Sequence, residues 1–409
     1  MNRSLHLHVV SLIILSCAGP AVLAATPQAQ RSGGEPSQDV EQVIGEAEQT
    51  PEQPLSTVDR PLYQSLQQSK KDLSTKYGIS WAVEDTLIYQ AASGGVDPND
   101  AMVNTLGVFA TWKIFRADNG KDFGGIGFQA EARGDLTDDH FTDMRDDLGT
   151  LWSPNDSTSD DYSKINQLWW GQRFSDGRLG VMIGKIDPGS QINGNRFAGS
   201  GNTQFFGQPF ATNPARSFPD NGLGLALRAE PIKWLDLQYT MSDSDAVSTY
   251  SPFKTVNGHW LYAGEINLKP KFEGLGQGNY RLMVYQRDTD DADEFGWSVS
   301  ADQNLSEKYG VFLRYGGNDG GLNSIQQIVS SGVSLLSPFG RSGDQTGVGI
   351  SWTHPTSNDL RDEYSGEVYY RLQVTEGFEL SADAQLILDP SASDNDAVGV
   401  FGLRARLLY

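Results

Sequence analysis

The chain has 409 residues, of which 38% are hydrophobic and 20% are charged, and its formal net charge is -21. This acidic balance argues against nucleic-acid binding, because no cluster of Lys and Arg forms a basic patch for phosphate groups. No apolar run beyond the first residues is long enough for a membrane helix, which argues against a helical membrane protein.

The first 24 residues have the features of a secretory signal. Arg3 precedes an apolar stretch over residues 9–15, and the segment ends in a small residue, Ala24. We therefore predict a signal peptide over 1–24, cleaved after Ala24. The one cysteine, Cys17, lies inside it, so no disulfide is expected in the mature chain. The alternative is a lipoprotein box that makes Cys17 the acylated first residue.

Residues 25 to about 57 are rich in Gln, Glu, Pro, Ser and Gly and contain almost no aromatic residues. Such a composition cannot bury enough surface to order itself, so we predict a disordered periplasmic segment. Leu62, Leu66 and Leu73 follow at the spacing of one helical face. This spacing predicts a short helix near 61–76 that packs at the mouth of the following domain.

From residue 78 to the C-terminus, after the N-terminal segment 25–77, apolar and polar residues alternate in about sixteen segments. These segments are 80–90, 102–115, 123–135, 163–175, 178–186, 222–230, 234–242, 258–268, 279–287, 295–304, 309–316, 328–336, 345–352, 364–374, 377–389 and 397–409. Many have about ten residues, the length needed to cross a bilayer at a tilt, whereas soluble strands average about five or six. We predict an all-β fold, an antiparallel transmembrane β-barrel of about 16 strands over 78–409.

The connections between these segments alternate in length. Tight turns at 175–177, 231–233, 306–308 and 375–377 each take an even position in the order, and longer polar links at 136–162, 187–221, 243–257 and 353–363 take odd positions. This parity indicates short periplasmic turns and long extracellular loops. It also argues against a soluble secreted β-protein, which has no reason to keep it.

The alternation assigns two faces to each strand. The apolar face, which we expect to contact lipid, includes Leu106, Val108 and Trp112 in the second strand and Leu237 and Tyr239 in the seventh. The opposite face lines the pore and mixes arginines with carboxylates. Its candidate site residues are Trp169, Arg173, Arg228, Arg314, Glu367, Arg371, Asp383 and Arg404. Two interpretations stay open: these charges satisfy one another and stiffen the wall, or some guanidinium groups bind sugar hydroxyls or anions.

The link 187–221 is too long to be structureless unless it serves a function. It contains several phenylalanines that are unsuited to extracellular water, so we predict that it folds into the lumen as the constriction. It would bring Phe206, Arg196, Arg216 and Asp220 into the pore. Aromatic rings beside polar donors suit carbohydrates. The alternative is that the rings only pack the link against the wall.

Acidic runs at 138–139, 160–161 and 288–294 lack the spacing of a recognised calcium-binding loop. We expect them to be solvated extracellular loops, bridged to lipopolysaccharide by divalent cations. No metal site and no cofactor is predicted.

Three groups of residues resemble the carbohydrate-selective porin (OprB) family, within a similarity that runs from Gly78 to Tyr409. They are Leu168-Trp169-Trp170-Gly171-Gln172 with Phe174, Asp176-Gly177, Leu179, Gly184 and Asp187; Leu223-Gly224-Leu225-Ala226-Leu227-Arg228 with Pro231; and Glu367, Tyr369-Tyr370-Arg371, Thr375, Asp383, Gln385, Pro390, Gly402 and Arg404. The sequence departs from the family at Met182 and Ala226, where polar or basic inward residues are expected, and it ends in Tyr409 rather than Phe.

The resemblance implies a sixteen-stranded outer-membrane porin that passes glucose and other sugars by facilitated diffusion as a homotrimer. We therefore predict passive, carbohydrate-preferring diffusion of small hydrophilic solutes across the bacterial outer membrane. The alternative, which the inward arginines permit, is a general or anion-preferring porin. An enzyme is not predicted, because His140, His259 and His354 lie in expected loops or at a strand end, away from a nucleophile.

Overall fold

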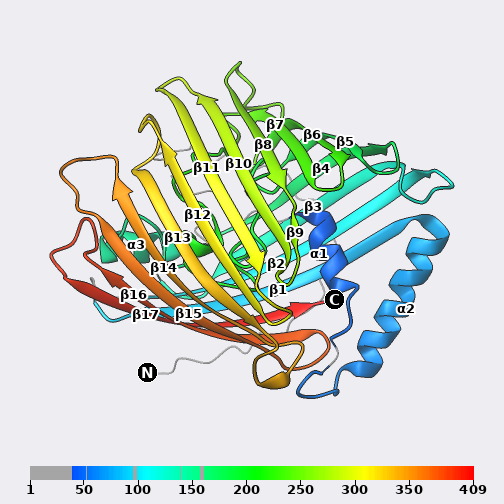
Figure 1. Cartoon of the computed structure of the whole chain (residues 1–409), viewed down its shortest axis with the longest axis horizontal. Helices are drawn as coiled ribbons and strands as arrows, with labels where there is room; N and C mark the ends of the chain where they lie inside the picture. The colour runs from blue at the N-terminus through cyan, green and yellow to red at the C-terminus, as the bar shows by residue number, and fades with distance from the viewer. Residues whose placement is uncertain (1–38, 52, 95–98, 139, 157–160) are drawn as a thin grey trace, which may run out of the picture. The chain divides into compact units, whose positions relative to one another are not determined.

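The computed structural model describes residues 39–51, 53–94, 99–138, 140–156 and 161–409. Within these ranges, seventeen strands form one antiparallel sheet, in which β9 (Lys271–Phe272) has only two residues and the others have 8 to 17. The last strand, β17 (Ala397–Leu408), pairs with the first, β1 (Ile79–Ala92), so the sheet closes into a barrel (Figure 1). The predicted fold class and strand number are therefore confirmed.

Each long strand pairs with its neighbours in sequence, and β8 pairs directly with β10 beside the short β9. The other strands are β2 (Asp100–Arg116), β3 (Phe123–Asp135), β4 (Tyr162–Phe174), β5 (Leu179–Ile186), β6 (Gly222–Ile232), β7 (Leu235–Asp243), β8 (Trp260–Leu268), β10 (Gly276–Asp288), β11 (Asp293–Asn304), β12 (Tyr309–Asn318), β13 (Ile325–Leu336), β14 (Gln345–Pro355), β15 (Glu363–Gln373) and β16 (Phe378–Leu388). Among the described residues, closure pairs both edges of every long strand, which is what a sheet surrounded by hydrocarbon requires.

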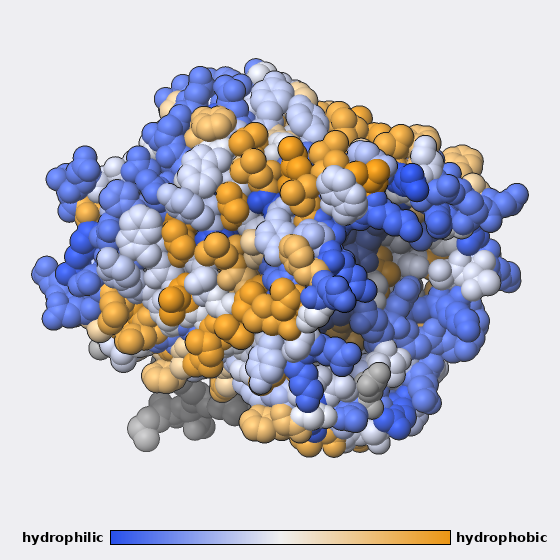
Figure 2. All heavy atoms as spheres, viewed as in Figure 1, coloured by the Kyte–Doolittle hydropathy of each residue, from blue (hydrophilic) through white to orange (hydrophobic). Residues whose placement is uncertain are grey.

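The two faces of the wall differ as the alternation predicts. In β17, Phe401 and Leu403 point outward and are 64% and 62% exposed. Arg404, the next residue, points inward and is 1% exposed. Figure 2 shows the resulting apolar band over the outer face of the strands, with hydrophilic residues gathered at the ends. The outer surface thus suits lipid and the inner surface suits polar groups.

Among the described residues, no helix is both long enough and apolar enough to cross a membrane. The helices are α1 (Val40–Ala47), α2 (Arg60–Tyr77), α3 (Phe141–Leu148), α4 (Gln208–Ala211) and a 3-10 turn over Pro338–Gly340. Helix α2 lies where the sequence predicts one, and it ends at Gly78, which adopts a left-handed φ of 74° that favours glycine. The predicted signal peptide over 1–24 lies outside the described residues.

Residues 40–47 form helix α1, whereas the composition of 25–57 predicts a disordered segment. The Asp39 carboxylate accepts the backbone N–H groups of Glu41 and Gln42 and so caps α1. The apolar residues of α1 recur at helical spacing, and they are buried against the inner wall. The composition rule fails here because it considers only this segment, whereas the barrel supplies the surface against which α1 packs.

The chain between α1 and α2 is attached to the turn that joins β15 and β16. The Asp59 carboxylate accepts the N–H groups of Glu376 and Gly377 at 3.3 and 3.1 Å. It also accepts the hydroxyl of Tyr409 at 3.3 Å. The N-terminal segment and the C-terminal residue are thus fixed at the same end of the barrel, the end with the short turns.

The outer face gives a test of membrane placement. We expect Leu403→Arg, in the middle of β17, to destabilise the barrel in lipid by about 2–4 kcal/mol, because a charge near the bilayer midplane is poorly solvated. Leu407→Arg, near the strand end, is the matched control and should cost about 0–1 kcal/mol. Urea unfolding in phospholipid vesicles measures both. Equal costs would place this face outside the hydrocarbon.

Candidate functional site

The loop 187–221, between β5 and β6, lies inside the barrel. Its backbone N–H groups at Phe206 and Gly207 donate to the Glu367 carboxylate of β15 at 2.5 and 3.0 Å. On another part of the wall, the N–H of Asn193 donates to Glu265 of β8 at 2.6 Å. Because β8 and β15 are well separated in the sheet order, the loop crosses the lumen. The predicted inward fold of this loop is confirmed.

The phenylalanines of the loop pack against the wall. The ring centroid of Phe205 lies 5.0 Å from that of Phe210, 5.6 Å from that of Phe312 in β12 and 4.7 Å from that of Tyr369 in β15. Glycines on the inner wall make room for this packing, since a Cβ added at Gly349 would lie 2.7 Å from the Phe210 ring. These rings have little free surface, so they hold the loop in place, as the alternative interpretation of the sequence proposed.

Two of the predicted pore arginines also hold the loop. The Arg314 guanidinium donates to the carbonyl oxygens of Ala198, at 2.5 Å, and of Phe210 and Thr212. The Arg404 guanidinium donates to the carbonyl of Gln204 at 3.0 Å. Both side chains are 1% exposed. These two arginines therefore fix the loop rather than project into open water.

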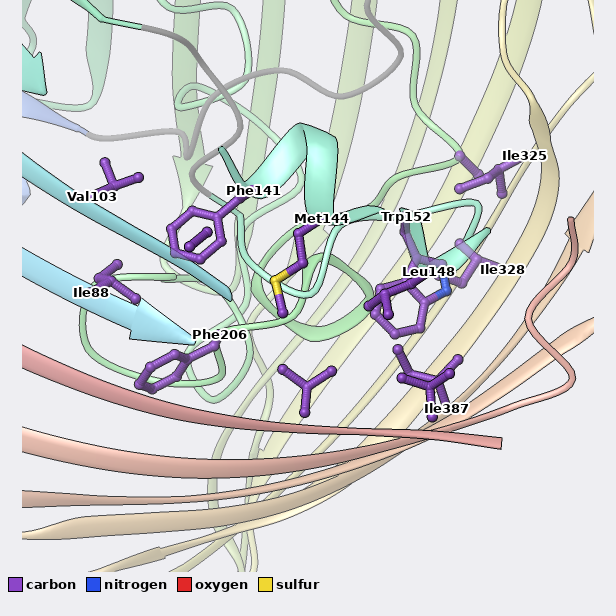
Figure 3. Close-up of a cluster of buried hydrophobic side chains, with 14 residues drawn as sticks. Ile88, Val103, Phe141, Met144, Leu148, Trp152, Phe206, Ile325, Ile328 and Ile387 are labelled. Atoms are coloured by element: carbon purple, nitrogen blue, oxygen red, sulfur yellow. The ribbon is translucent and has the colours of Figure 1, made fainter. Parts of the chain in front are cut away.

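In the link between β3 and β4, the described residues 140–156 also enter the lumen, although the sequence predicts a long extracellular loop over 136–162. Phe141, Met144 and Leu148 of α3 are fully buried, and Figure 3 shows them directed toward side chains of the strands and toward Phe206. The acidic runs that we expect to be solvated, 138–139 and 160–161, flank α3 without including it, and Asp139 and Asp160 lie outside the described residues. The sequence analysis does not predict the buried helix between them. The spacing of three and four residues between these apolar side chains is the sequence signal that identifies this helix.

The two loops are joined to each other across the lumen. The N–H of Ser153 donates to the Gln208 side-chain oxygen at 2.9 Å, and the N–H of Asp156 donates to the carbonyl of Phe206 at 2.9 Å. The carbonyl of Pro154 accepts Gln385 of β16 at 2.8 Å. Together, the loop segments 150–156 and 187–221 form the constriction of the lumen.

The other predicted site residues fall into distinct environments. Trp169 is buried against α1, and Arg173 forms an ion pair with Glu41 of α1. Three arginines form ion pairs: Arg196 with Asp302 at 2.5 Å, Arg228 with Asp236 at 3.5 Å and Arg371 with Glu379 at 3.7 Å. The two aspartates accept hydrogen bonds: Asp220 from the backbone N–H of Ser248 at 3.2 Å, and Asp383 from the Gln385 amide at 2.8 Å. The loop thus brings together Phe206, Arg314, Glu367 and Arg404, whereas Trp169 and Arg173 belong to the contact with α1.

Arg216 has the least direct pairing of the constriction arginines. Its guanidinium donates to the Thr212 hydroxyl at 3.1 Å and lies 4.5 Å from the centre of the Phe218 ring. Within the described part of the chain, no carboxylate lies within 4.0 Å of it. Burial lowers the pKa of Arg216, and the more distant carboxylates of Asp187 and Asp156 oppose this shift.

Asp156, which sequence reasoning did not select, is the titratable group beside this arginine. Burial raises the pKa of Asp156 to about 7, although the charges of Arg216, Arg314 and Arg133 oppose the shift. The carboxyl group is therefore largely neutral below this pH and charged above it. No local motif marks Asp156, because its burial depends on two loops that meet inside the barrel.

Comparison with known proteins relates this geometry to a family. The sequence profile of the carbohydrate-selective porin, OprB family, matches residues 131–295 and 287–407. Porin AaxA of Chlamydia abortus is 23% identical over 254 residues, which cover 59% of this chain and 56% of that protein. Porin AaxA of Chlamydia trachomatis serovar D is 26% identical over 263 residues, which cover 59% of this chain and 55% of that protein. The chain thus spans little more than half the length of these relatives.

Solved structures show the same fold. OprB of Pseudomonas putida at high pH superposes with a TM-score of 0.70 at 16% identity, covering 83% of this chain and 96% of that one. The low-pH structure of the same protein gives a TM-score of 0.56 at 17% identity, and the match covers 88% of this chain and 100% of that one.

Glu367 tests the attachment of the constriction loop. We expect Glu367→Ala to weaken that attachment by about 2–5 kcal/mol, because two buried backbone donors lose their acceptor. The measurement is cleavage of 187–221 by added protease in the folded, detergent-solubilised protein. Glu307→Ala, on an exposed turn, is the control. Cleavage as slow as in the control would show that Glu367 does not hold the loop.

The pKa of Asp156 predicts a pH-dependent ion selectivity. As pH rises from about one unit below that pKa to about one unit above it, a negative charge forms at the constriction, so permeability to potassium relative to chloride should increase. Reversal potentials under a salt gradient measure this ratio. Asp156→Asn should keep the low-pH ratio throughout. A wild-type ratio that stays constant would refute the assignment.

Proposed function

The chain belongs to the carbohydrate-selective porin, OprB family, and we propose that it conducts small neutral sugars by passive diffusion. The family model supports a porin of the bacterial outer membrane rather than an enzyme. A barrel with a narrowed, polar lumen selects by size and by the groups that replace the hydration of the solute. The chemistry of those groups supports a neutral polyhydroxyl solute.

The observation that carries this proposal is the pairing of charges on the inner wall. Asp302 pairs with both Arg196 and Arg281, at 2.5 and 2.8 Å. Arg406 pairs with Glu84 at 2.6 Å and with Glu379 at 3.0 Å. Paired charges leave a weak field but keep many oriented donors and acceptors, which suits sugar hydroxyls better than ions.

Arg216 is the group best placed to contact a solute at the constriction. A guanidinium has five N–H donors in a fixed fork, and only one bond of Arg216 to another side chain is present among the described residues, the one to Thr212. Its remaining donors can bind adjacent hydroxyls of a sugar ring. Asp220 and Arg228 are further polar candidates, with partly exposed and exposed positions respectively.

The second candidate is a general or anion-preferring porin, and Arg216 is the observation that favours it. An arginine without a close carboxylate attracts anions as well as hydroxyl groups. The two candidates differ in how the pore treats a neutral sugar and an anion of matched size.

The assembly and export of the protein are also proposals. We infer a homotrimer in the outer membrane, with lipopolysaccharide around its extracellular loops, and a signal peptide over 1–24 that is removed after Ala24. The family resemblance supports the trimer, and the charge and hydropathy pattern of the first residues supports the signal.

Solute preference is tested in proteoliposomes. We expect swelling to be faster with glucose than with gluconate, its anionic analogue of similar size, and glucose to reduce the ionic current through single channels. Arg216→Ala should weaken this current block roughly tenfold, because a charged hydrogen bond contributes about 1.5–3 kcal/mol. Arg178→Ala, on an exposed turn, is the matched control. Faster entry of gluconate would favour the anion-preferring candidate.

A further inference from the structure

Helix α1 lies inside the barrel at the end that carries the short turns. Val40, Val43, Ile44 and Ala47 are 2% to 7% exposed. They form one hydrophobic cluster with inward-facing side chains of several strands, namely Ala82, Phe109, Trp169, Ile186 and Ala226. A helix that packs on the inner face of the wall occupies space through which a solute must otherwise pass.

Ion pairs hold both ends of α1 to the wall. Near its start, Glu41 pairs with Arg173 of β4. Near its end, Glu46 pairs with Arg406 of β17 at 2.9 Å. Because β4 and β17 lie apart in the sheet order, with β1 to β3 between them, α1 spans this arc of the wall.

Helix α2 fixes the other side of α1. The Gln67 amide donates to the carbonyl of Ala47 at 2.6 Å, and the Tyr63 hydroxyl donates to the carbonyl of Gln49 at 2.7 Å. The Ala47 carbonyl belongs to the last turn of α1, whose carbonyl groups the helix itself leaves unpaired, and Gln49 follows two residues after the helix. A helix of eight residues is marginal in water, so these contacts and the wall together account for its order.

The residues of the wall are suited to this helix. Met182 and Ala226 are apolar at inward positions where the family resemblance leads us to expect polar or basic side chains. Ala226, which is 6% exposed, lies in the cluster that covers α1, and Met182 is partly buried and packs against this cluster. An apolar inward residue facing open water would be unfavourable, whereas one beneath α1 is buried. The helix therefore explains both departures.

Two cavities flank α1. One, of about 420 Å³, is lined by Glu46 and Ala47 on the helix and by Arg371, Glu379 and Arg406 on the wall. The other, of about 180 Å³, is lined by Asp39 and Glu41 together with Trp169, Arg173 and Arg228. Figure 2 shows the surface hollowed beside α1. The helix thus lies between two cavities at this end of the barrel.

We propose that α1 is a second constriction, at the periplasmic end of the lumen, which limits the size of the solutes that leave the channel. It acts in series with the loop constriction and is built from a different part of the chain. The inference rests on the channel function alone and does not depend on the preference for sugars.

The test displaces α1 and measures the pore. Ile44→Asp places a carboxylate in the apolar contact with the wall and should drive the helix out, whereas Gln64→Asp adds the same group on the exposed face of α2, outside the proposed constriction. We expect the single-channel conductance in potassium chloride to rise roughly twofold or more in Ile44→Asp, because the helix no longer occupies this end of the lumen. Gln64→Asp should conduct like the wild type. Proteoliposomes with Ile44→Asp should also admit larger oligosaccharides.

Labelling shows separately whether the helix has moved. In a background with Cys17→Ser, an Ala226→Cys side chain lies beneath α1 and should react slowly with a membrane-impermeant maleimide. Adding Ile44→Asp should expose it. Fast labelling without a rise in conductance would overturn the proposal, since the helix would have left without widening the pore. Slow labelling with unchanged conductance would overturn it as well, because the apolar contact would not be what seats α1.

A second variant covers the case in which Ile44→Asp does not fold. Glu41→Ala with Glu46→Ala removes both ion pairs and leaves the apolar wall intact, so conductance should rise with the fraction of channels that label at Ala226→Cys. Heat-modifiable migration on gels reports folding of each variant. Because the readout is potassium chloride conductance, the outcome does not depend on whether glucose or an anion is the preferred solute.

Discussion

The structure depends on one constraint: a charged side chain inside the barrel must have a partner wherever water is displaced. On the inner wall this constraint sets the path of the chain. Arg314 requires acceptors, and the carbonyl groups of Ala198 and Phe210 supply them. Glu367 requires donors, and the backbone at Phe206 supplies one. The long loop therefore follows the charged positions of the wall, and the constriction takes its shape from this pairing.

Close packing between the loop phenylalanines and the wall also holds the loop. The wall has glycine where the loop has a large ring, as at Gly310 beneath Phe197 and at Gly349 beneath Phe210. A methyl group at either position would overlap or crowd the ring. Hydrogen bonds and close packing therefore both hold the loop against the inner wall.

Sequence reasoning recovers the strands because their signal is local: the alternation around Arg404 repeats every two residues and needs no partner to be recognised. It also places the loop, since its phenylalanines have no other favourable environment. It does not recover α3, whose residues Phe141 and Met144 are buried only because apolar strand residues such as Val400 lie opposite in space. Nor does it show whether Arg314 faces water, because its partners are backbone carbonyl groups, which every residue carries.

The family profile covers the loop constriction but not α1. The matched residues, 131–295 and 287–407, contain the loop constriction, whereas α1 lies outside them, so its role must be argued from its own contacts. Two narrow regions in series add their resistances, and the narrower one sets the passage of solute. If α1 is the narrower, substitutions at the loop will change which solutes bind more than how fast they cross. Selectivity and rate would then be controlled by separate parts of one barrel, which lets either change while the wall stays the same.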